Sequence, residues 1–350
     1  MNMVPDIAIG WTGLPTYGAR LIRHFTDRYS GNVEVLATRA AVPFKDLEEE
    51  LGRKVVWLTE NAARTWTDLG MSRPQIFVHT AWNVPAFNSL AREVSANGGH
   101  VVMLIDNRFK GTVRQHLGGL YFRLARKPWL SAAIVPGASA RQFSRLLGFS
   151  SQRIFEGQYG IDLAKYNSTP SLPERERVFM FVGQLIHRKG LDTLMRAWQS
   201  LPAGHSWKLR VFGVGPMETL VRNASNVEYQ GFLQPSELAG EYRKSRVLIL
   251  PSREDHFPLV TLEAAASGCG LLVSDAVGTC SELKRVSNVR VFKAGEDVDL
   301  SNAIQYFMAL KDREWLEVEK ESKAASSRFG VDRFAGAMNA CLDALGSTAQ

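Results

Sequence analysis

The sequence predicts an α/β protein with two domains, each built on a parallel β-sheet. The length of 350 residues suggests two domains at about 150 residues per domain. Residues 246–282 contain a strand, a loop, a helix and a second strand, the order typical of an open parallel sheet. The pattern of strand, glycine loop and helix begins near Ile7 and begins again at Val178, which indicates one sheet in each half.

The stretch from 246 to 282 has the clearest pattern of elements. Arg246 to Leu250 is a short apolar run that predicts a buried strand, and Gly270 to Ser274 predicts a second one. Between them, Pro258 at a first helical position and Gly268 just past the end bracket a helix. Ligands of such sheets bind at the carboxyl ends of the strands, where helix N-termini offer N–H groups to anions.

Two carboxylates flank the start of this helix: Asp255 in the loop, and Glu263 eight positions later. With their neighbours they resemble the signature of the retaining nucleotide-sugar glycosyltransferases of family four, which have the GT-B fold. The residues that fit this signature are Pro251, Ser252, Asp255, Glu263, Ala264, Ala266 and Gly268. The family has a glutamate where this chain has Asp255, which is one methylene shorter. The alternative interpretation is a βαβ unit with an exposed acidic loop.

Apolar runs and helical spacing predict the other elements in order. Strands are expected in the first half at Ile7–Gly10, Val33–Ala37, Lys54–Leu58, Gln75–His79, His100–Ile105 and Ala132–Val135. Strands are expected in the second half at Val178–Val182 and Lys208–Phe212, besides the two above. Helices are expected at Arg20–Tyr29, Leu191–Leu201, Leu300–Leu310 and 313–350. Two more are expected in the first half: one that begins at Ala86, and one that follows the strand Ala132–Val135 and ends at Leu147.

The resemblance covers nearly the whole chain and implies the GT-B fold, with two Rossmann-like parallel-sheet domains facing a deep cleft. We expect an acceptor-binding domain over residues 1–166 and a linker rich in Ser, Pro and charge over 167–177. The donor-binding domain would then cover 178–325, and a C-terminal helix over 326–350 would cross back to the first domain.

Three glycine loops follow strands, at Thr12–Gly18, Gly183–Gly190 and Gly213–Pro216, and glycine lets a backbone approach a diphosphate. The resemblance implies that Lys189 binds the donor diphosphate. Gln184 stands where the family has an arginine, so one of two cationic contacts to the diphosphate is missing, and Arg188 is the candidate to supply it. The resemblance also implies that Glu263 binds the ribose and that Asp255 binds the transferred sugar. The expected donor-binding residues are Gly13, Gln184, Arg188, Lys189, Gly213, Phe232, Leu233, Asp255, His256, Phe257, Pro258, Leu259 and Glu263; the expected catalytic residues are Asp106, Lys189 and Asp255.

Two polar residues end strands in the first half. Asp106 follows Ile105 where many relatives have a His-Asp pair, so only the aspartate role carries over. A helix-capping aspartate is the alternative. His79 ends its own strand, either facing the cleft or serving as a hydrogen-bonded structural histidine.

The formal charge of +7 arises in residues 101–150, which hold eight Lys and Arg against Asp106. Apolar side chains interleave with these cations between Lys110 and Ala133. The pattern suits a surface helix on anionic lipid or on an anionic acceptor, and equally a solvated basic face over a core-facing stripe. The residues of this membrane or acceptor patch are Arg114, Arg123, Arg126 and Lys127. Nucleic acid is a poorer explanation, because no zinc spacing or RNA-binding aromatic motif accompanies the patch.

The chain contains three widely spaced cysteines, which form no metal or disulfide framework. Asp297-Val-Asp299 has the spacing of a metal motif but precedes a helix, so Asp299 is expected to cap it and no metal site is expected. We expect no cofactor, only a nucleotide diphosphate sugar as donor substrate. Without a signal peptide or a long apolar run, the protein is expected to be cytoplasmic, or peripheral on the inner face of the membrane.

The expected function is therefore transfer of a sugar from a nucleotide diphosphate sugar to a glycan, glycolipid or other hydroxyl acceptor, with retention and without a metal. The resemblance suggests a place in cell-surface polysaccharide or glycolipid synthesis. The alternatives are a non-catalytic relative that binds sugar nucleotides and a nucleotide-sugar epimerase on the same fold. A dehydrogenase is excluded, because none of these glycine loops has Gly-x-Gly-x-x-Gly with an acidic residue about 20 positions on.

Overall fold

The computed structural model describes residues 6–40, 46–59, 64–166, 170–222 and 224–346. The chain divides into two compact units: unit 1 is Met1–Gly160 with Val331–Gln350, and unit 2 is Ile161–Gly330. The first boundary therefore lies after residue 160 instead of 166, and the chain returns to unit 1 at residue 331 instead of 326. Of the expected linker, 167–169 lie outside the described residues, and the remainder belongs to unit 2.

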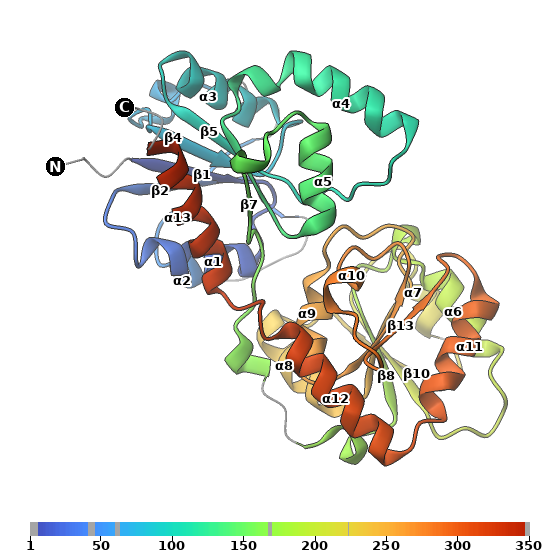
Figure 1. Ribbon diagram of the computed structural model, residues 1–350. Coiled ribbons are helices and arrows are strands. Elements are labelled where there is room, and N and C mark those ends of the chain that lie inside the picture. Colours follow the sequence, from blue (N-terminus) through green and yellow to red (C-terminus); the bar gives the residue numbers. More distant parts are fainter. Residues whose placement is uncertain (1–5, 41–45, 60–63, 167–169, 223, 347–350) are drawn as a thin grey trace. The chain divides into compact units, whose positions relative to one another are not determined.

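Unit 1 is built on a parallel sheet whose strands run in the order β3-β2-β1-β4-β5-β6-β7 (Figure 1). Strand β1, third in this order, aligns Ile7 with Val33 of β2 on one side and with Ile76 of β4 on the other. Strands buried on both faces are apolar throughout, which explains why β1 has no polar alternation. The strands are β1 (Ile7–Trp11), β2 (Val33–Ala37), β3 (Val56–Trp57), β4 (Ile76–His79), β5 (His100–Leu104), β6 (Ala132–Val135) and β7 (Ile154–Glu156).

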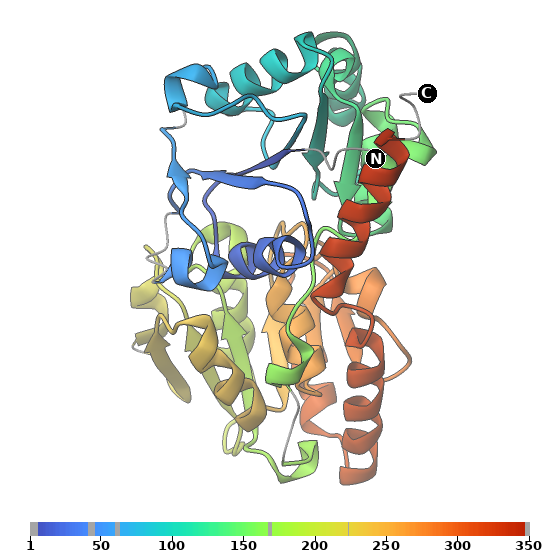
Figure 2. The same ribbon diagram turned by 90° about the vertical axis from the view of Figure 1, so that its left-hand side faces the viewer.

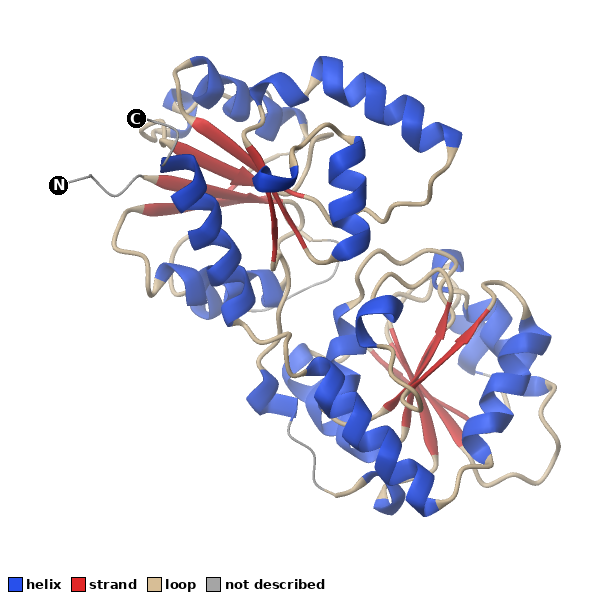
Figure 3. Cartoon of the chain, viewed as in Figure 1, coloured by secondary structure: helices blue, strands red, loops and turns tan. Residues whose placement is uncertain are grey.

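Helices cover both faces of this sheet (Figure 3). The α-helices of unit 1 are α1 (Thr16–Thr26), α2 (Leu47–Leu51), α3 (Pro85–Ala96), α4 (Val113–Ala125), α5 (Ala138–Leu146) and α13 (Asp332–Gly346). Short 3-10 helices are η1 (Thr67–Leu69), η2 (Lys127–Trp129) and η3 (Ser151–Arg153). The last helix, α13 (red in Figures 1 and 2), packs against α1, so the two ends of unit 1 in sequence lie side by side.

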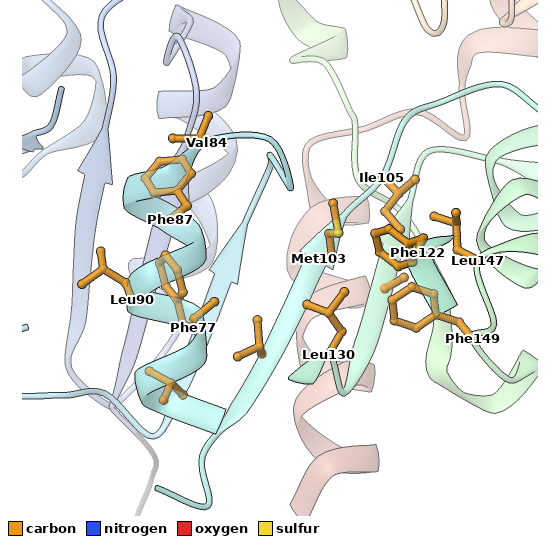
Figure 4. Packing of buried hydrophobic residues seen from close by; sticks show 14 of the residues in the cluster. Phe77, Val84, Phe87, Leu90, Met103, Ile105, Phe122, Leu130, Leu147 and Phe149 are labelled. Carbon is orange, nitrogen blue, oxygen red and sulfur yellow. The ribbon is translucent and has the colours of Figure 1, made fainter. Parts of the chain in front are cut away.

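A core cluster joins the sheet of unit 1 to α3, α4 and α5. Phe77 of β4 packs edge-on against Trp66 and Phe87, with ring centroids 5.3 and 6.1 Å apart. Farther along the sheet, Phe122 of α4 lies beside Phe149 (Figure 4). Burial of large aromatic side chains is a main source of stability, because each removes much apolar surface from water.

Unit 2 repeats the same architecture with a parallel sheet in the order β10-β9-β8-β11-β12-β13. Its strands are β8 (Val178–Val182), β9 (Lys208–Phe212), β10 (Val227–Gly231), β11 (Val247–Leu250), β12 (Gly270–Ser274) and β13 (Val289–Phe292). Its α-helices are α6 (Leu191–Gln199), α7 (Glu218–Arg222), α8 (Pro235–Lys244), α9 (Leu259–Ala266), α10 (Cys280–Leu283), α11 (Asp297–Met308) and α12 (Asp312–Ser326). Its 3-10 helices are η4 (Leu163–Tyr166), η5 (Leu172–Glu174) and η6 (His187–Lys189).

In both sheets the strand order reverses direction in the middle, between β1 and β4 and between β8 and β11. Ligands of doubly wound sheets bind outside the carboxyl ends of the strands at this reversal, because the flanking helices leave in opposite directions there. The predicted α/β architecture, with one parallel sheet in each half of the chain, is confirmed. A binding site in unit 2 is therefore expected at the loops after β8 and β11.

Three expected helices differ from the structure by three residues or more at one end or are divided, and Pro258, expected as a first helical residue, is instead the N-cap of its helix. The helix expected at Arg20–Tyr29 begins at Thr16, directly after Pro15, which has the extended backbone of an N-cap. The helix expected over 313–350 is two helices, because the first ends at Ser326 and the second begins at Asp332. The helix expected at Leu300 begins three residues earlier.

Candidate functional site

The loop after β8 and the loop after β11 meet at the point where the sheet of unit 2 reverses. Gly190 closes the first loop with a φ of +72°, and a Cβ atom there would overlap the carbonyl oxygen of Pro251 in the second loop. Only glycine allows both this backbone conformation and this approach. The two loops are also joined by a hydrogen bond of 2.8 Å from the Arg253 N–H to the Arg188 carbonyl.

The expected residues Lys189 and Asp255 form an ion pair between these loops. Lys189 Nζ donates to Asp255 Oδ2 at 2.5 Å, and the two side chains are only 13% and 11% exposed. Ser252 Oγ donates to the same oxygen at 3.3 Å. An ammonium group has three N–H donors, and among the described residues Asp255 is the only hydrogen-bond partner of Lys189 Nζ, so two donors remain for an anion.

The sequence did not reveal the role of Arg253, which holds the two loops together. Its guanidinium binds both carboxylate oxygens of Asp192, each at 2.7 Å, and Thr193 Oγ1 at 3.0 Å. It also donates to the carbonyl oxygen of His187 at 2.9 Å. These hydrogen bonds from Arg253 hold the pKa of Asp192 well below its usual value. A bidentate arginine fixes geometry better than a single contact, so this pair positions the Lys189 loop.

Glu263 is held by a tyrosine from another helix. Tyr242 of α8 is buried, and its hydroxyl donates to Glu263 Oε2 at 2.9 Å. Burial, followed by the charge of Glu263, raises the pKa of Tyr242 well above its usual value, so the phenol stays a donor at neutral pH. One oxygen of Glu263 thus has a fixed orientation within the first two turns of α9.

The other expected donor residues of the loops after β8, β9 and β10 also lie at this end of the sheet. Gln184 is exposed, and the guanidinium of Arg188 donates to the Glu254 carbonyl at 2.8 Å, next to Asp255. Gly213 follows β9, and its N–H donates to the Gly231 carbonyl at 2.8 Å. Phe232 and Leu233 follow β10 and are half-buried.

The remaining expected donor residues lead into α9, whose N-cap is Pro258 with an extended backbone and no side-chain capping bond. Leu259 is the first helical residue and is buried. His256 Nε2 lies 3.9 Å from Glu254 Oε1, and the Phe257 ring lies 6.2 Å from the Phe329 ring. Uncapped N–H groups and the helix dipole make this helix start attractive to an anion.

The backbone amides of the Gly13 loop donate hydrogen bonds to neighbouring loops within unit 1. The N–H groups of Thr12 and Gly13 donate to Thr80 Oγ1 and Thr38 Oγ1, both at 2.8 Å, and the Leu14 N–H donates to the Thr38 carbonyl at 3.2 Å. The Gly13 N–H therefore has a partner within unit 1, and the expectation that Gly13 binds the donor stays a prediction.

Asp106 lies after β5 and accepts a hydrogen bond of 3.0 Å from the hydroxyl of buried Tyr159. The Tyr159 ring meets Tyr17 edge-on at 5.8 Å, so residues after β1, β5 and β7 come together in unit 1. Burial and then the Asp106 charge raise the pKa of Tyr159 well above its usual value. The alternative of a helix cap is wrong, because Thr112 caps α4 by accepting the Gln115 N–H.

His79 is a buried structural histidine. Its ring stacks on Phe77 with centroids 5.2 Å apart, and Nδ1 lies 3.1 Å from the Ala81 carbonyl oxygen, so Nδ1 carries the proton. Its Nε2 is buried without a partner among the described residues. Burial lowers the pKa of His79 to about 4, because protonation would place an unpaired charge in the core.

The structure divides the four arginines and lysines of the expected basic patch. Lys127 turns inward: its ammonium donates to the Leu130 carbonyl at 2.8 Å and lies 4.8 Å from the centre of the Phe149 ring. Burial lowers the pKa of Lys127 as a result. Arg126 lies over the Trp129 ring at 5.6 Å. Lys127 is therefore half-buried, and its place in the membrane or acceptor patch stays a prediction.

Arg114 and Arg123 lie on the exposed part of α4. The alternative of a core-facing apolar stripe on this helix is wrong, because only Gly119 and Phe122 of α4 are buried.

In the described ranges, no group of three His, Cys, Asp or Glu side chains is arranged to hold a metal ion. Asp297 instead accepts a hydrogen bond of 2.8 Å from Arg196, which lowers its pKa. Asp299 accepts the Lys293 N–H at 2.7 Å from inside the first turn of α11, so the expected capping position is wrong by three residues.

Comparison with known proteins finds similarity to glycosyltransferases in part of the chain. Residues 165–324 match the family model described as "Glycosyl transferases group 1". An uncharacterized glycosyltransferase of Methanocaldococcus jannaschii is 29% identical over 130 residues, which are 35% of this chain and 33% of that protein. The lipopolysaccharide core biosynthesis mannosyltransferase LpcC of Rhizobium leguminosarum bv. viciae is 26% identical over 208 residues, 54% of this chain and 59% of LpcC. This chain therefore spans less than two thirds of the curated relatives it matches.

Among solved structures, Anabaena HepE in complex with UDP and glucose superimposes with a TM-score of 0.74 and 16% identity, over 98% of this chain and 100% of HepE. This likeness shows a shared fold over the whole chain, and it agrees with the two parallel sheets described above. The predicted GT-B fold is confirmed. The chain thus has the GT-B fold, and its residues 165–324 match the family model of the glycosyl transferases group 1.

Proposed function

We propose that this chain is a retaining glycosyltransferase that moves a sugar from a nucleotide diphosphate sugar to a hydroxyl group of a glycan or lipid-linked acceptor. The observation that carries the proposal is the buried Lys189–Asp255 pair at the reversal of the unit 2 sheet, beside the start of α9. It combines a cation with spare N–H donors and a carboxylate, which suit a diphosphate and a sugar hydroxyl. The complex of HepE with UDP and glucose supports such a donor.

Negative charge develops on the leaving group during the reaction, and residues of unit 2 can stabilise that charge. The bond between the anomeric carbon and the diphosphate breaks, so negative charge grows on the leaving phosphate. Lys189 and the N–H groups at the start of α9 can stabilise this charge without a metal. Asp255 would accept hydrogen bonds from the transferred sugar, and Glu263, held by Tyr242, from the ribose.

The acceptor oxygen forms the new bond on the face from which the phosphate leaves, and the leaving phosphate takes the acceptor's proton. No protein nucleophile is assigned in this scheme. Asp255 is already held by Lys189 and Ser252, which suits a binding role. The match to a mannosyltransferase of lipopolysaccharide core biosynthesis supports an acceptor in cell-surface polysaccharide or glycolipid synthesis.

The test measures nucleotide release by the full chain from UDP-, GDP- and ADP-sugars, with and without hydroxyl acceptors, and with and without EDTA. We expect release to rise with one donor–acceptor pair, to persist in EDTA, and to give a product with the donor's anomeric configuration. A sugar that is isomerised while it stays attached to the nucleotide would instead identify an epimerase. Binding without release would identify a non-catalytic relative.

Variants link the activity to the site. Lys189→Ala should lower transfer by about 1.5–3 kcal/mol in transition-state binding, or roughly 10- to 150-fold, because it removes a charge-assisted hydrogen bond. Asp255→Asn should lower transfer more than nucleotide affinity, and Glu263→Gln should do the reverse. Lys320→Ala is the matched control, since Lys320 is 76% exposed on α12. Equal effects of Asp255→Asn and Glu263→Gln on nucleotide affinity would contradict the proposed roles.

A further inference from the structure

Helix α4 (Val113–Ala125) exposes a stripe of large apolar side chains to solvent. The stripe consists of Val113, Leu117, Leu120, Tyr121 and Leu124, which are 57–76% exposed. Their spacing of four, three, one and three residues places them on one face of a helix, within an arc of about 100°. Half of the exposed large hydrophobic side chains in the described part of the chain lie on this helix. Single exposed leucines are ordinary, but a continuous stripe marks an interaction surface.

The opposite face of α4 fixes the helix to unit 1, so the stripe is held outward. Phe122 is buried, with its ring 5.1 Å from the Trp82 ring, and Figure 4 shows it beside Leu147. Gly119 is buried as well, and a Cβ there would lie 2.9 Å from Leu146 Cγ, which lets α4 pass close to the end of α5. Figures 1 and 3 show α4 on the outside of unit 1. Turning the stripe inward would expose Phe122.

The surroundings of the stripe carry charge of one sign. Between Asp106 and Glu156 the sequence has nine Lys and Arg residues and no acidic residue. Arg114 and Arg123 lie on the two sides of the stripe on α4 itself, and Arg123 is fixed by a hydrogen bond of 2.9 Å to the Leu146 carbonyl. An apolar face bordered by arginines is the composition of helices that lie in the interface of an anionic bilayer.

We propose that α4 docks unit 1 on the surface of an anionic phospholipid bilayer. The helix would lie parallel to the membrane, with Leu117, Leu120 and Leu124 among the acyl chains about 5–10 Å below the headgroups. Arg114 and Arg123 would remain at the level of the phosphates, where each cation adds about fivefold to binding. Tyr121, at the edge of the stripe, suits the boundary because its ring is apolar and its hydroxyl polar.

Two observations favour a bilayer over a second copy of this chain. Self-association through α4 would bring one positively charged surface against its own copy, with no acidic residue on α4 to pair with the arginines. The stripe is also convex and narrow, one helix of 13 residues and about 20 Å in length. No helix in the described ranges combines the length and the hydrophobicity that crossing a membrane requires.

The experiment is sedimentation of the full chain with vesicles of phosphatidylglycerol and phosphatidylcholine, compared with vesicles of phosphatidylcholine alone. No nucleotide sugar is present, so the outcome is independent of the proposed transfer reaction. The test variant is Leu117→Gln/Leu120→Gln/Leu124→Gln, because glutamine favours helix and these positions contribute little to the core. Leu316→Gln on α12 is the control, since Leu316 is also exposed and helical. Circular dichroism and the unfolding midpoint verify that each variant is folded.

We expect the wild type and Leu316→Gln to sediment with the anionic vesicles and to be released as salt rises, while the triple variant stays in the supernatant. Arg114→Gln should weaken binding roughly fivefold at low salt. No binding of the wild type, or equal binding of the triple variant, would overturn the proposal. A dimer that the triple variant loses, without vesicle binding, would also overturn it and assign the stripe to a second copy.

Discussion

Asp255 is a buried carboxylate in unit 2, and its partner Lys189 compensates the cost of burying it. Their side chains are 11% and 13% exposed, so neither charge is fully hydrated. Removing one partner leaves the other charge unpaired in the same place, which costs more than the pair itself contributes. The pair therefore prepares the ligand-free site and keeps the ammonium at the place where a phosphate would bind.

A double-mutant cycle tests this pairing. Lys189→Met and Asp255→Leu should each lower the free energy of unfolding by about 1–3 kcal/mol, because each leaves a buried charge alone. The double variant should lose less than the sum of the two, with a coupling of about 0.5–3 kcal/mol. The measurement is urea unfolding of the ligand-free chain. Additive losses would mean that the two side chains do not interact in solution.

His79 should make the stability of unit 1 depend on pH. Its pKa falls from 6.5 to about 4 on burial, so between these values the unfolded chain binds a proton that the folded chain does not. Stability should therefore be full above pH 6.5 and fall as the pH drops toward 4, by about 3 kcal/mol in total. His79→Phe should flatten this dependence in unfolding measurements from pH 4.5 to 7.

The control for this prediction is His116→Gln, because His116 is exposed on α4. That variant should keep the full pH dependence. His100, whose pKa is also lowered by burial, leaves a residual slope in His79→Phe. A slope identical to that of the wild type would show that His79 is not the titrating group.

Single residues also show what the sequence leaves open. The resemblance to a family signature predicts Lys189, Asp255 and Glu263 as site residues, whereas the contacts of Arg253 and Tyr242 were missed. Arg253 binds Asp192, 61 positions away, and Tyr242 binds Glu263, 21 positions away. Pairings of this kind depend on the order of strands in the sheet, which no local spacing encodes.

At the scale of elements, the side chain of Arg253 connects the loop after β11 to the loop after β8 and to the start of α6. Arg253→Lys keeps the charge but loses the fork that binds Asp192 with two hydrogen bonds. We expect the affinity for UDP, or for the nucleotide that the chain prefers, to fall by about 1–2 kcal/mol, since the Lys189 loop is then less well held. Titration calorimetry with the nucleotide measures this change.

The control is Arg177→Lys, because Arg177 is exposed and donates to Ser206 Oγ away from the loops. It should leave nucleotide affinity unchanged. Unaltered affinity in Arg253→Lys would show that the Lys189 loop keeps its position without the bidentate pair.

Strands were predicted well where they are apolar and buried on both faces. Val33–Ala37, Val178–Val182 and Gly270–Ser274 have the bounds expected. The strand at Val289–Phe292 was missed, because it is four residues long and contains an exposed arginine. The final helix was expected to be continuous, whereas Phe329 is buried and its carbonyl accepts the Ile161 N–H, a contact that ends the helical run.

At the scale of the whole molecule, each unit has its own sheet and its own buried residues. The expected division was displaced by five or six residues, because the segment after Gly160 pairs with unit 2 through the bridge between Ile161 and Gly330. The sequence shows only where the composition changes. The boundary between the two units depends instead on which unit buries the side chains near it. The linker pattern, rich in Ser and Pro, includes a 3-10 helix at Leu172–Glu174, whose Leu172 is buried.

Nucleotide binding should protect the two units unequally. At a hundredfold excess over its dissociation constant, a ligand adds about 2.7 kcal/mol to the state that binds it. Hydrogen exchange of the full chain should then slow by about a hundredfold for the amides of unit 2 that exchange by unfolding. Residues 183–190 and 251–263 should be protected most, because they form the proposed donor site. Protection confined to the Gly13 loop of unit 1 would locate the nucleotide elsewhere.

The glycines that separate the site loops have a consequence for redesign. A side chain at Gly190 would overlap the Pro251 carbonyl oxygen, and one at Gly278 would overlap the His256 carbonyl oxygen. At these two glycines the loops therefore meet backbone against backbone, and these contacts do not involve the side chains of Gln184 and His256. A library that keeps these two glycines and randomises Gln184 and His256 should yield folded proteins with altered sugar preference. The reason is that the backbone contacts at the two glycines do not require the side chains of Gln184 and His256.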